Sequence, residues 1–86
     1  MAFNDVANDY YEKSYNDALE TCRKEVEEEL AFSHNNVNGK TLERLLEKGY
    51  TRERAVDAIA GVYASYRTEA YMYGRSFSIE YELNRL

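Results

Sequence analysis

The sequence predicts a small all-α protein, and three observations support that prediction. No proline and only four glycines interrupt its 86 residues. Residues with high helix propensity, chiefly Ala, Leu, Glu, Lys and Arg, are plentiful. Apolar residues recur at spacings of three and four, as they do on one face of a helix. No repeat, linker or low-complexity segment divides the chain, so we expect residues 1–86 to form a single small helical domain.

The first predicted helix is long and acidic. Asn4 or Asp5 can cap its start, and its periodic pattern continues to about Phe32. About 28 residues at 1.5 Å each would span about 40 Å, which is long for so small a domain. The apolar stripe that should face the core consists of Tyr11, Tyr15, Ala18, Leu19, Cys22, Val26 and Leu30.

A loop over residues 33–39, rich in Asn, separates this helix from a short one over about Lys40 to Lys48. Three leucines of the short helix should face inward: Leu42, Leu45 and Leu46. Gly49 is placed to end the short helix with a positive φ, and Thr51 to cap the next. We expect the long first helix to pack antiparallel on this helix–elbow–helix unit.

The third helix should run over residues 52–73, with Gly61 at a close helix crossing. Its inward side would carry Ala55, Val56, Ile59, Val62, Tyr63, Tyr66, Ala70 and Tyr73. The tail is ambiguous, because residues 76–83 alternate polar and apolar as in a strand, while Ile79, Leu83 and Leu86 share one helical face. We favour a helix. The alternative is a single β-strand that pairs with its copy across a dimer.

Charge is concentrated in the first helix. Residues 1–32 carry a net charge of −6 and residues 33–86 a net charge of +1, which together give −5. This balance argues against nucleic acid or an anionic membrane as the main partner, and it favours a protein partner with a basic surface. A chain this short buries only roughly 60–65% of its unfolded surface. We therefore expect a homodimer.

The sequence indicates the cytoplasm. Cys22 is the only cysteine, so no internal disulfide can form and a reducing compartment is expected. No leader pattern opens the chain, and no window approaches the ~20 apolar residues of a membrane span.

Residues able to support catalysis are scarce. Cys22 lies on the apolar stripe and His34 in the loop, so they do not form a nucleophile–base pair, and zinc lacks ligands. Gly39-Lys40-Thr41 matches the end of a P-loop, but the glycine required five residues earlier is His34. We expect no enzyme activity, no cofactor and no metal site.

The elbow suggests one alternative function. Arg52 and Arg54 could open the recognition helix of a helix-turn-helix-like DNA-binding regulator, although Arg44 and Lys48 stand where that motif needs apolar residues. The stretch from Leu45 to Ala55 also resembles the first loop of ubiquitin-associated domains, whose Gly-aromatic pair belongs to a hydrophobic binding patch. The long helix expected after Ala55 departs from that pattern, so the family is not assigned.

Nine of the twelve aromatic residues are tyrosines, a residue type enriched at protein interfaces. Three of them should lie off the core and could contact a partner: Tyr10, Tyr50 and Tyr71. The acidic run offers further candidate contacts at Glu25, Glu27, Glu28 and Glu29. The sequence therefore predicts a non-enzymatic protein–protein interaction module, such as a small acidic inhibitor or regulator that covers a basic surface.

Overall fold

The computed structural model describes residues 2–32, 36–70 and 78–86, with side chains over 12–32, 36–69 and 78–86. Within these ranges the elements are all helical, which confirms the all-α class, and the ranges contain no strand. The elements are α1 (Ala2–Phe32), α2 (Val37–Glu47), α3 (Arg52–Ser65), the π-helical turn η1 (Tyr66–Ala70) and α5 (Ile79–Arg85).

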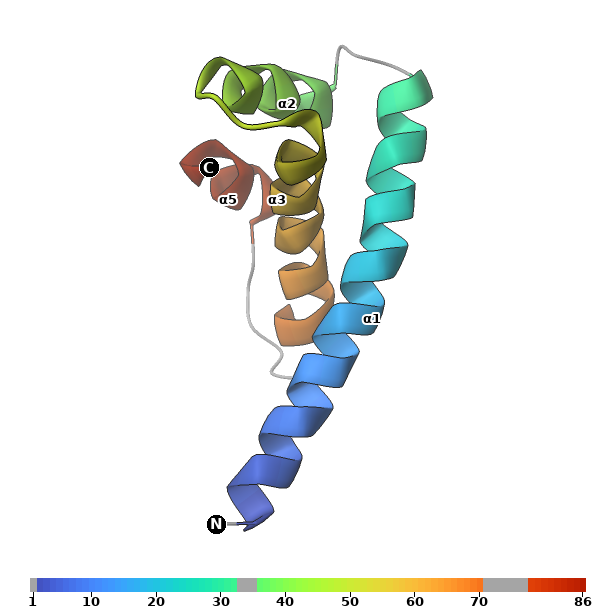
Figure 1. Cartoon of the computed structure of the whole chain (residues 1–86), viewed down its shortest axis with the longest axis vertical. Helices are drawn as coiled ribbons and strands as arrows, with labels where there is room; N and C mark the ends of the chain where they lie inside the picture. Colours follow the sequence, from blue (N-terminus) through green and yellow to red (C-terminus); the bar gives the residue numbers. More distant parts are fainter. Residues whose placement is uncertain (1, 33–35, 71–77) are drawn as a thin grey trace.

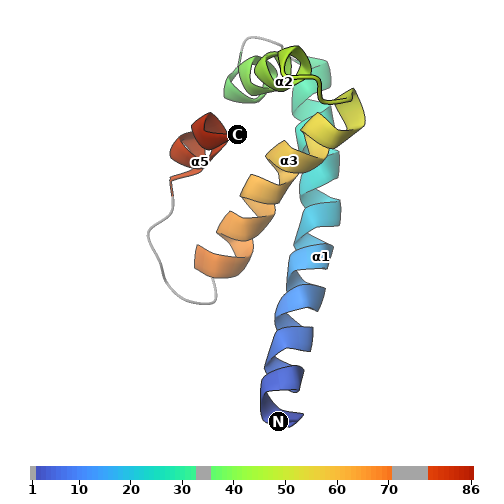
Figure 2. The ribbon, with the colours of Figure 1, turned by 60° about the vertical axis from the view of Figure 1, so that its left-hand side comes forward.

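Helix α3 lies between the other helices. Figures 1 and 2 show α1 along one side of α3, α5 on the other side, and α2 across the end where α3 begins. Helices α1 and α3 run in opposite directions, and the first turns of α1 extend beyond α3 (Figure 1). The side-chain contacts follow this order, since Glu27 meets Arg52 while Tyr15, earlier in α1, meets Gly61, later in α3.

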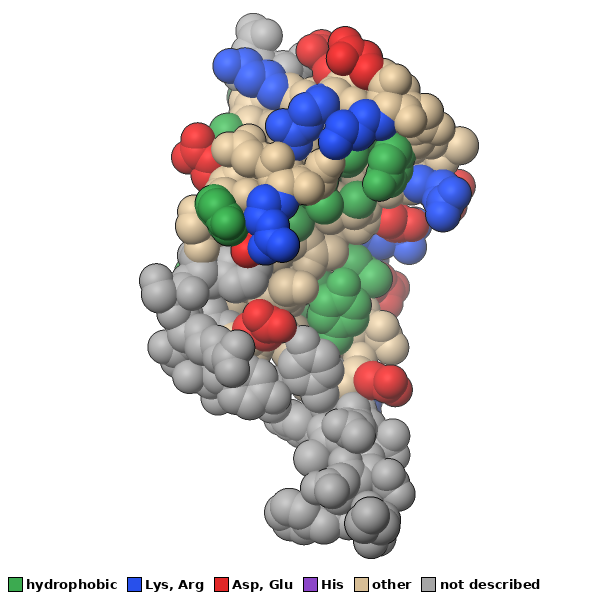
Figure 3. Space-filling view, turned by 90° about the vertical axis from the view of Figure 1, so that its left-hand side faces the viewer, with side chains coloured by type: hydrophobic (Ala, Val, Ile, Leu, Met, Phe, Trp, Pro, Cys, Tyr) green, Lys and Arg blue, Asp and Glu red, His purple; other side chains and the backbone are tan. Residues whose placement is uncertain are grey.

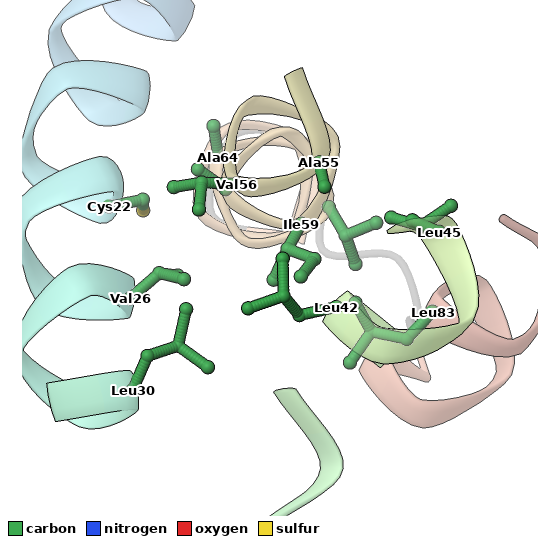
Figure 4. Close-up of a cluster of buried hydrophobic side chains, with 12 residues drawn as sticks. Cys22, Val26, Leu30, Leu42, Leu45, Ala55, Val56, Ile59, Ala64 and Leu83 are labelled. Atoms are coloured by element: carbon green, nitrogen blue, oxygen red, sulfur yellow. The ribbon is translucent and has the colours of Figure 1, made fainter. Parts of the chain in front are cut away.

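The core is built where α1, α2 and α5 meet α3. Figure 4 shows Cys22, Val26 and Leu30 pointing from α1 toward the side chains of α2 and α3. The other core residues are Leu42, Leu45, Ala55, Val56, Ile59, Ala60, Val62, Ala64 and Leu83. The predicted stripe of α1 is thus confirmed for its described side chains. Each fully buried leucine contributes roughly 1.5–3 kcal/mol by leaving water.

Helix α2 begins three residues earlier than predicted, at Val37 rather than Lys40. The side chain of Asn36 caps it by accepting a hydrogen bond from the Gly39 amide at 2.8 Å. The inward position of Leu46 was also predicted wrongly, since its side chain is 42% exposed.

The elbow between α2 and α3 matches its prediction. Gly49 has φ +101°. Its amide donates to the Leu46 carbonyl and the Tyr50 amide to the Leu45 carbonyl, the two hydrogen bonds of a Schellman motif. Thr51 caps α3 by accepting from the Arg54 amide at 3.2 Å. These paired caps turn the chain sharply between two helices.

The predicted third helix over 52–73 is helical as far as it is described, to residue 70, but its last described turn is π-helical rather than α-helical. Helix α3 ends at Ser65, and the π-helical turn follows. The Thr68 hydroxyl donates to the Ala64 carbonyl at 2.8 Å and is buried there, a bond that favours bending of a helix. Tyr66, predicted to face the core, is 41% exposed. Tyr73 lies outside the described residues.

The tail forms a helix, as favoured from the sequence. Ser78 caps α5 by accepting from the Tyr81 amide at 3.2 Å. Leu83 is fully buried against α2 and α3, and Ile79 and Leu86 pack beside it. The alternating pattern that suggested a strand puts Tyr81 on the solvent side instead. Residues 76 and 77 of that pattern lie outside the described residues.

We predict that Gly49→Ala destabilises the protein by about 1–2 kcal/mol, because a Cβ disfavours positive φ. Chemical denaturation measures this difference. Glu47→Ala, at an exposed position two residues earlier, should stay within about 0.5 kcal/mol of the wild type. Equal stability of both variants would contradict the positive φ at Gly49.

Candidate functional site

Two of the predicted acidic contact residues are engaged within the protein. Glu25 Oε2 accepts from Arg67 Nη2 at 2.5 Å, and Glu27 Oε1 accepts from Arg52 Nη1 at 2.8 Å. The two glutamates lie on opposite edges of the apolar stripe of α1, so they tie α1 to η1 and to the start of α3. Their side chains remain about half exposed, and such surface pairs contribute only about 0–1 kcal/mol each.

Glu28 and Glu29 remain exposed on α1. Glu28 lies at a surface hollow that it shares with Glu20, Arg23, Lys24 and Glu27. Because that surface mixes both signs of charge, it presents a weaker negative field than the acidic run alone suggests.

The predicted tyrosines are only partly described. Tyr50 is 43% exposed at the elbow, near the exposed Leu46 in sequence. Tyr10 belongs to α1, but its side chain lies outside the described ones, and Tyr71 lies outside the described residues. Tyr81 was missed as a surface residue: it is 61% exposed, and the Arg85 guanidinium lies 5.7 Å from its ring centre.

A groove of about 450 Å³ lies along α3, and residues of α1, η1 and the end of α5 form its sides. Ala58, Gly61 and Ser65 line it from α3. These small residues recur at helical spacing, so they leave the α3 surface low, while Tyr15 and Leu86 line the groove from α1 and from the end of α5. The result is a partly apolar groove with walls from two other helices.

Three carboxylates line this groove, from three different elements: Asp57 of α3, Glu69 of η1 and Glu82 of α5. No basic side chain lines it among the described residues. Figure 3 shows hydrophobic side chains near the middle of one described face with side chains of both charges around them, while most of the Lys and Arg side chains lie toward the α2 end. The lining residues make the groove a partly apolar surface with three carboxylates.

Two of these carboxylates have basic neighbours outside the groove. Arg23 Nε lies 2.7 Å from the buried Oδ1 of Asp57, yet its N–H is not directed well enough to give that oxygen a hydrogen bond. Arg85 lies 3.5 Å from Glu82. Because both pairs are partly exposed and imperfect in geometry, an incoming cation can compete for these oxygens.

Sequence reasoning missed this groove. Its residues come from four separate elements, and the acids stand singly in the sequence rather than in a run. One usable signal was present at Gly61, where a Cβ would lie 3.3 Å from the Tyr15 hydroxyl. Gly61 was assigned only to a close helix crossing. Its spacing from Ala58 and Ser65 would have indicated a low helix surface as well.

Cys22 is a core residue rather than a reactive one. Its side chain is fully buried, and this burial raises the pKa of the thiol, while nearby Arg67 lowers it and Glu25 raises it. Burial likewise raises the pKa of Tyr63, whose hydroxyl donates to Asn38 Oδ1 at 2.9 Å. A low thiolate fraction makes Cys22 a poor nucleophile.

Within the described residues, no group of three or more His, Cys, Asp or Glu side chains is placed to hold a metal ion. The described helices include none with a stretch long and apolar enough to cross a membrane.

Comparison of the chain with protein-family models, curated proteins and solved structures gives no match.

We predict that stability falls as pH rises above about 8.5, the ordinary range of a thiol. The unfolded chain then releases the Cys22 proton that the folded protein retains, so unfolding becomes more favourable. Denaturation across pH 7.5–9.5 should show a shallower decline in Cys22→Ala. Tyr63→Phe is the control, because its effect on the slope should begin only near pH 10. An identical decline in wild type and Cys22→Ala would contradict the raised thiol pKa.

Proposed function

We propose that this protein is a non-enzymatic protein–protein interaction module that binds a basic segment of another protein. The observation that supports this best is the groove, since its apolar floor is bordered by Asp57, Glu69 and Glu82. An amphipathic basic helix could place apolar side chains over Ala58 and Gly61 and direct its cations to these carboxylates. Such a partner would match both the shape and the charge of the groove.

The net charge of −5 supports the same class of partner. A negative protein attracts a basic surface over a longer range than the contacts themselves, which raises the rate of association. A small acidic inhibitor is one protein that would work this way. Glu28 and Glu29 are exposed acids of α1 outside the groove lining, whereas Glu25 and Glu27 pair with internal arginines.

A helix-turn-helix-like DNA-binding regulator remains the second hypothesis, but the contacts of the elbow support it less. Arg44 and Lys48 donate to carbonyl groups of α5, and Arg52 pairs with Glu27. Lys40 and Arg54 are the exposed bases left on this stretch. Neutralising few phosphates gives little of the electrostatic affinity on which DNA binding depends.

We predict that a peptide of leucines at helical spacing with lysines between them binds the groove. NMR titration should shift the amides of Ala58, Gly61 and Ser65. Glu82→Lys should weaken binding roughly tenfold, about 1.4 kcal/mol, because a cation then meets a cation. Glu80→Lys is the matched control: it makes the same charge change two residues away, outside the groove lining, and should change the affinity less than twofold.

Two results would count against this proposal. A peptide with glutamates in place of the lysines should not bind. Comparable binding of both peptides would show that the groove does not select its ligand by charge. Shifts confined to the outer face of α1 around Glu28 would move the binding surface away from the groove.

Homodimerisation stays a prediction. The exposed apolar side chains of Phe32 and Leu46 offer surface for a second copy. Light scattering coupled to gel filtration should give a mass near 20 kDa, twice the 10.1 kDa of one chain. A mass near that of one chain at high micromolar concentration would contradict it.

A further inference from the structure

Helix α5 cannot be stable without its contacts to α2 and α3. It has only seven residues, whereas isolated helices shorter than ~12–15 residues are marginal in water. Its only fully buried side chain is Leu83. The position of α5 therefore depends on what holds it against α2 and α3.

Two cations of α2 hold the C-terminal end of α5. Arg44 Nη2 donates to the Leu83 carbonyl at 2.6 Å, and Lys48 Nζ donates to the Leu86 main-chain oxygen at 2.7 Å. Arg44 and Lys48 are four residues apart, so they reach from the same face of α2. The Leu83 carbonyl also accepts from the Leu86 amide at 3.2 Å, and Leu86 caps the helix. Main-chain oxygens at a helix C-terminus carry partial negative charge, so the two cations are favourably placed there.

Arg44 is committed to this contact. Its side chain is partly buried, and its Nε is a buried donor without a hydrogen-bond partner among the described residues. Burying the Nε donor without a partner costs free energy. The hydrogen bond from Nη2 to the Leu83 carbonyl offsets that cost and explains why the side chain lies there. A DNA-binding helix-turn-helix motif would need an apolar residue at this position. The contact with α5 explains why an arginine stands there instead.

Helix α5 also supplies part of the groove. Glu82 and Leu86 line it. Glu82 directly precedes Leu83, whose carbonyl accepts from Arg44, and the main-chain oxygen of Leu86 accepts from Lys48. When α5 leaves α2 and α3, the groove loses a carboxylate and an apolar wall. The remaining surface of α3 would be open on that side.

We infer that Arg44 and Lys48 act as a latch that docks α5 and thereby forms the basic-segment site. This inference rests on the proposed function for its ligand, whereas the latch itself rests on the two hydrogen bonds. Binding and docking are then coupled in both directions. A ligand in the groove stabilises docked α5, and loss of the latch lowers the affinity for the ligand.

The test compares Arg44→Met/Lys48→Met with Lys40→Met/Arg54→Met, which removes the same charge at two exposed positions. Methionine keeps much of the apolar stem while removing the donors. Hydrogen exchange of the α5 amides should become at least tenfold faster in the latch variant only, while amides of α1 and α3 near Cys22 and Ile59 keep their protection. The lysine–leucine peptide should bind the latch variant at least tenfold more weakly.

Each arm can overturn part of the inference. Unchanged exchange in α5 would show that the two cations do not hold it. Faster exchange with unchanged peptide affinity would show that docking does not form the site. If the wild type does not bind the peptide, the proposed function and its coupling fail, while the exchange result alone decides the latch. Lys48→Met alone, at an exposed position, replaces the double variant if that one does not fold.

Discussion

The whole structure depends on burying α3 from several sides at once. Its core residues point in more directions than one neighbouring helix can cover, so α1 packs on one side, α5 on another and α2 across its start. In a chain of 86 residues this arrangement fully buries Leu30, Leu45, Ile59 and Leu83, while other large apolar side chains, such as that of Phe32, stay exposed. Ala58, Gly61 and Ser65 are only partly buried by the described residues. The groove lies over them, with residues of α1, η1 and the end of α5 at its sides.

Charged side chains then fix these neighbours in place. Arg52 and Arg67 hold the two edges of α1, while Arg44 and Lys48 hold the end of α5. Most of the bases near the elbow are therefore used inside the molecule. At the groove, Asp57 and Glu82 have partly exposed basic partners of imperfect geometry, and no basic side chain among the described residues lines it. The basic side chains thus serve the packing of the helices, while the carboxylates at the groove favour a basic partner.

Local patterns in the sequence predicted the helices and their caps, because 3.6-residue periodicity, Gly49 and Thr51 act over a few neighbouring residues. The same patterns placed Leu46 and Tyr66 wrongly, since exposure depends on which helices happen to cover a face. They also missed Asn36 as a cap, because an Asn-rich stretch favours loops as well as helix starts. The groove required tertiary contacts among four elements, which no local pattern contains.

The ambiguous tail shows how tertiary contacts decide between two local preferences. Alternation over residues 76–83 suited a strand, yet a strand there would have needed a partner for its amides and carbonyls. As a helix, α5 buries Leu83 and leaves main-chain oxygens at its end that Arg44 and Lys48 can reach. Both bases stand on α2 where a DNA-binding motif would need apolar residues. Arg44 and Lys48 therefore weaken the DNA-binding hypothesis and at the same time contact the end of α5, which supplies Glu82 to the groove.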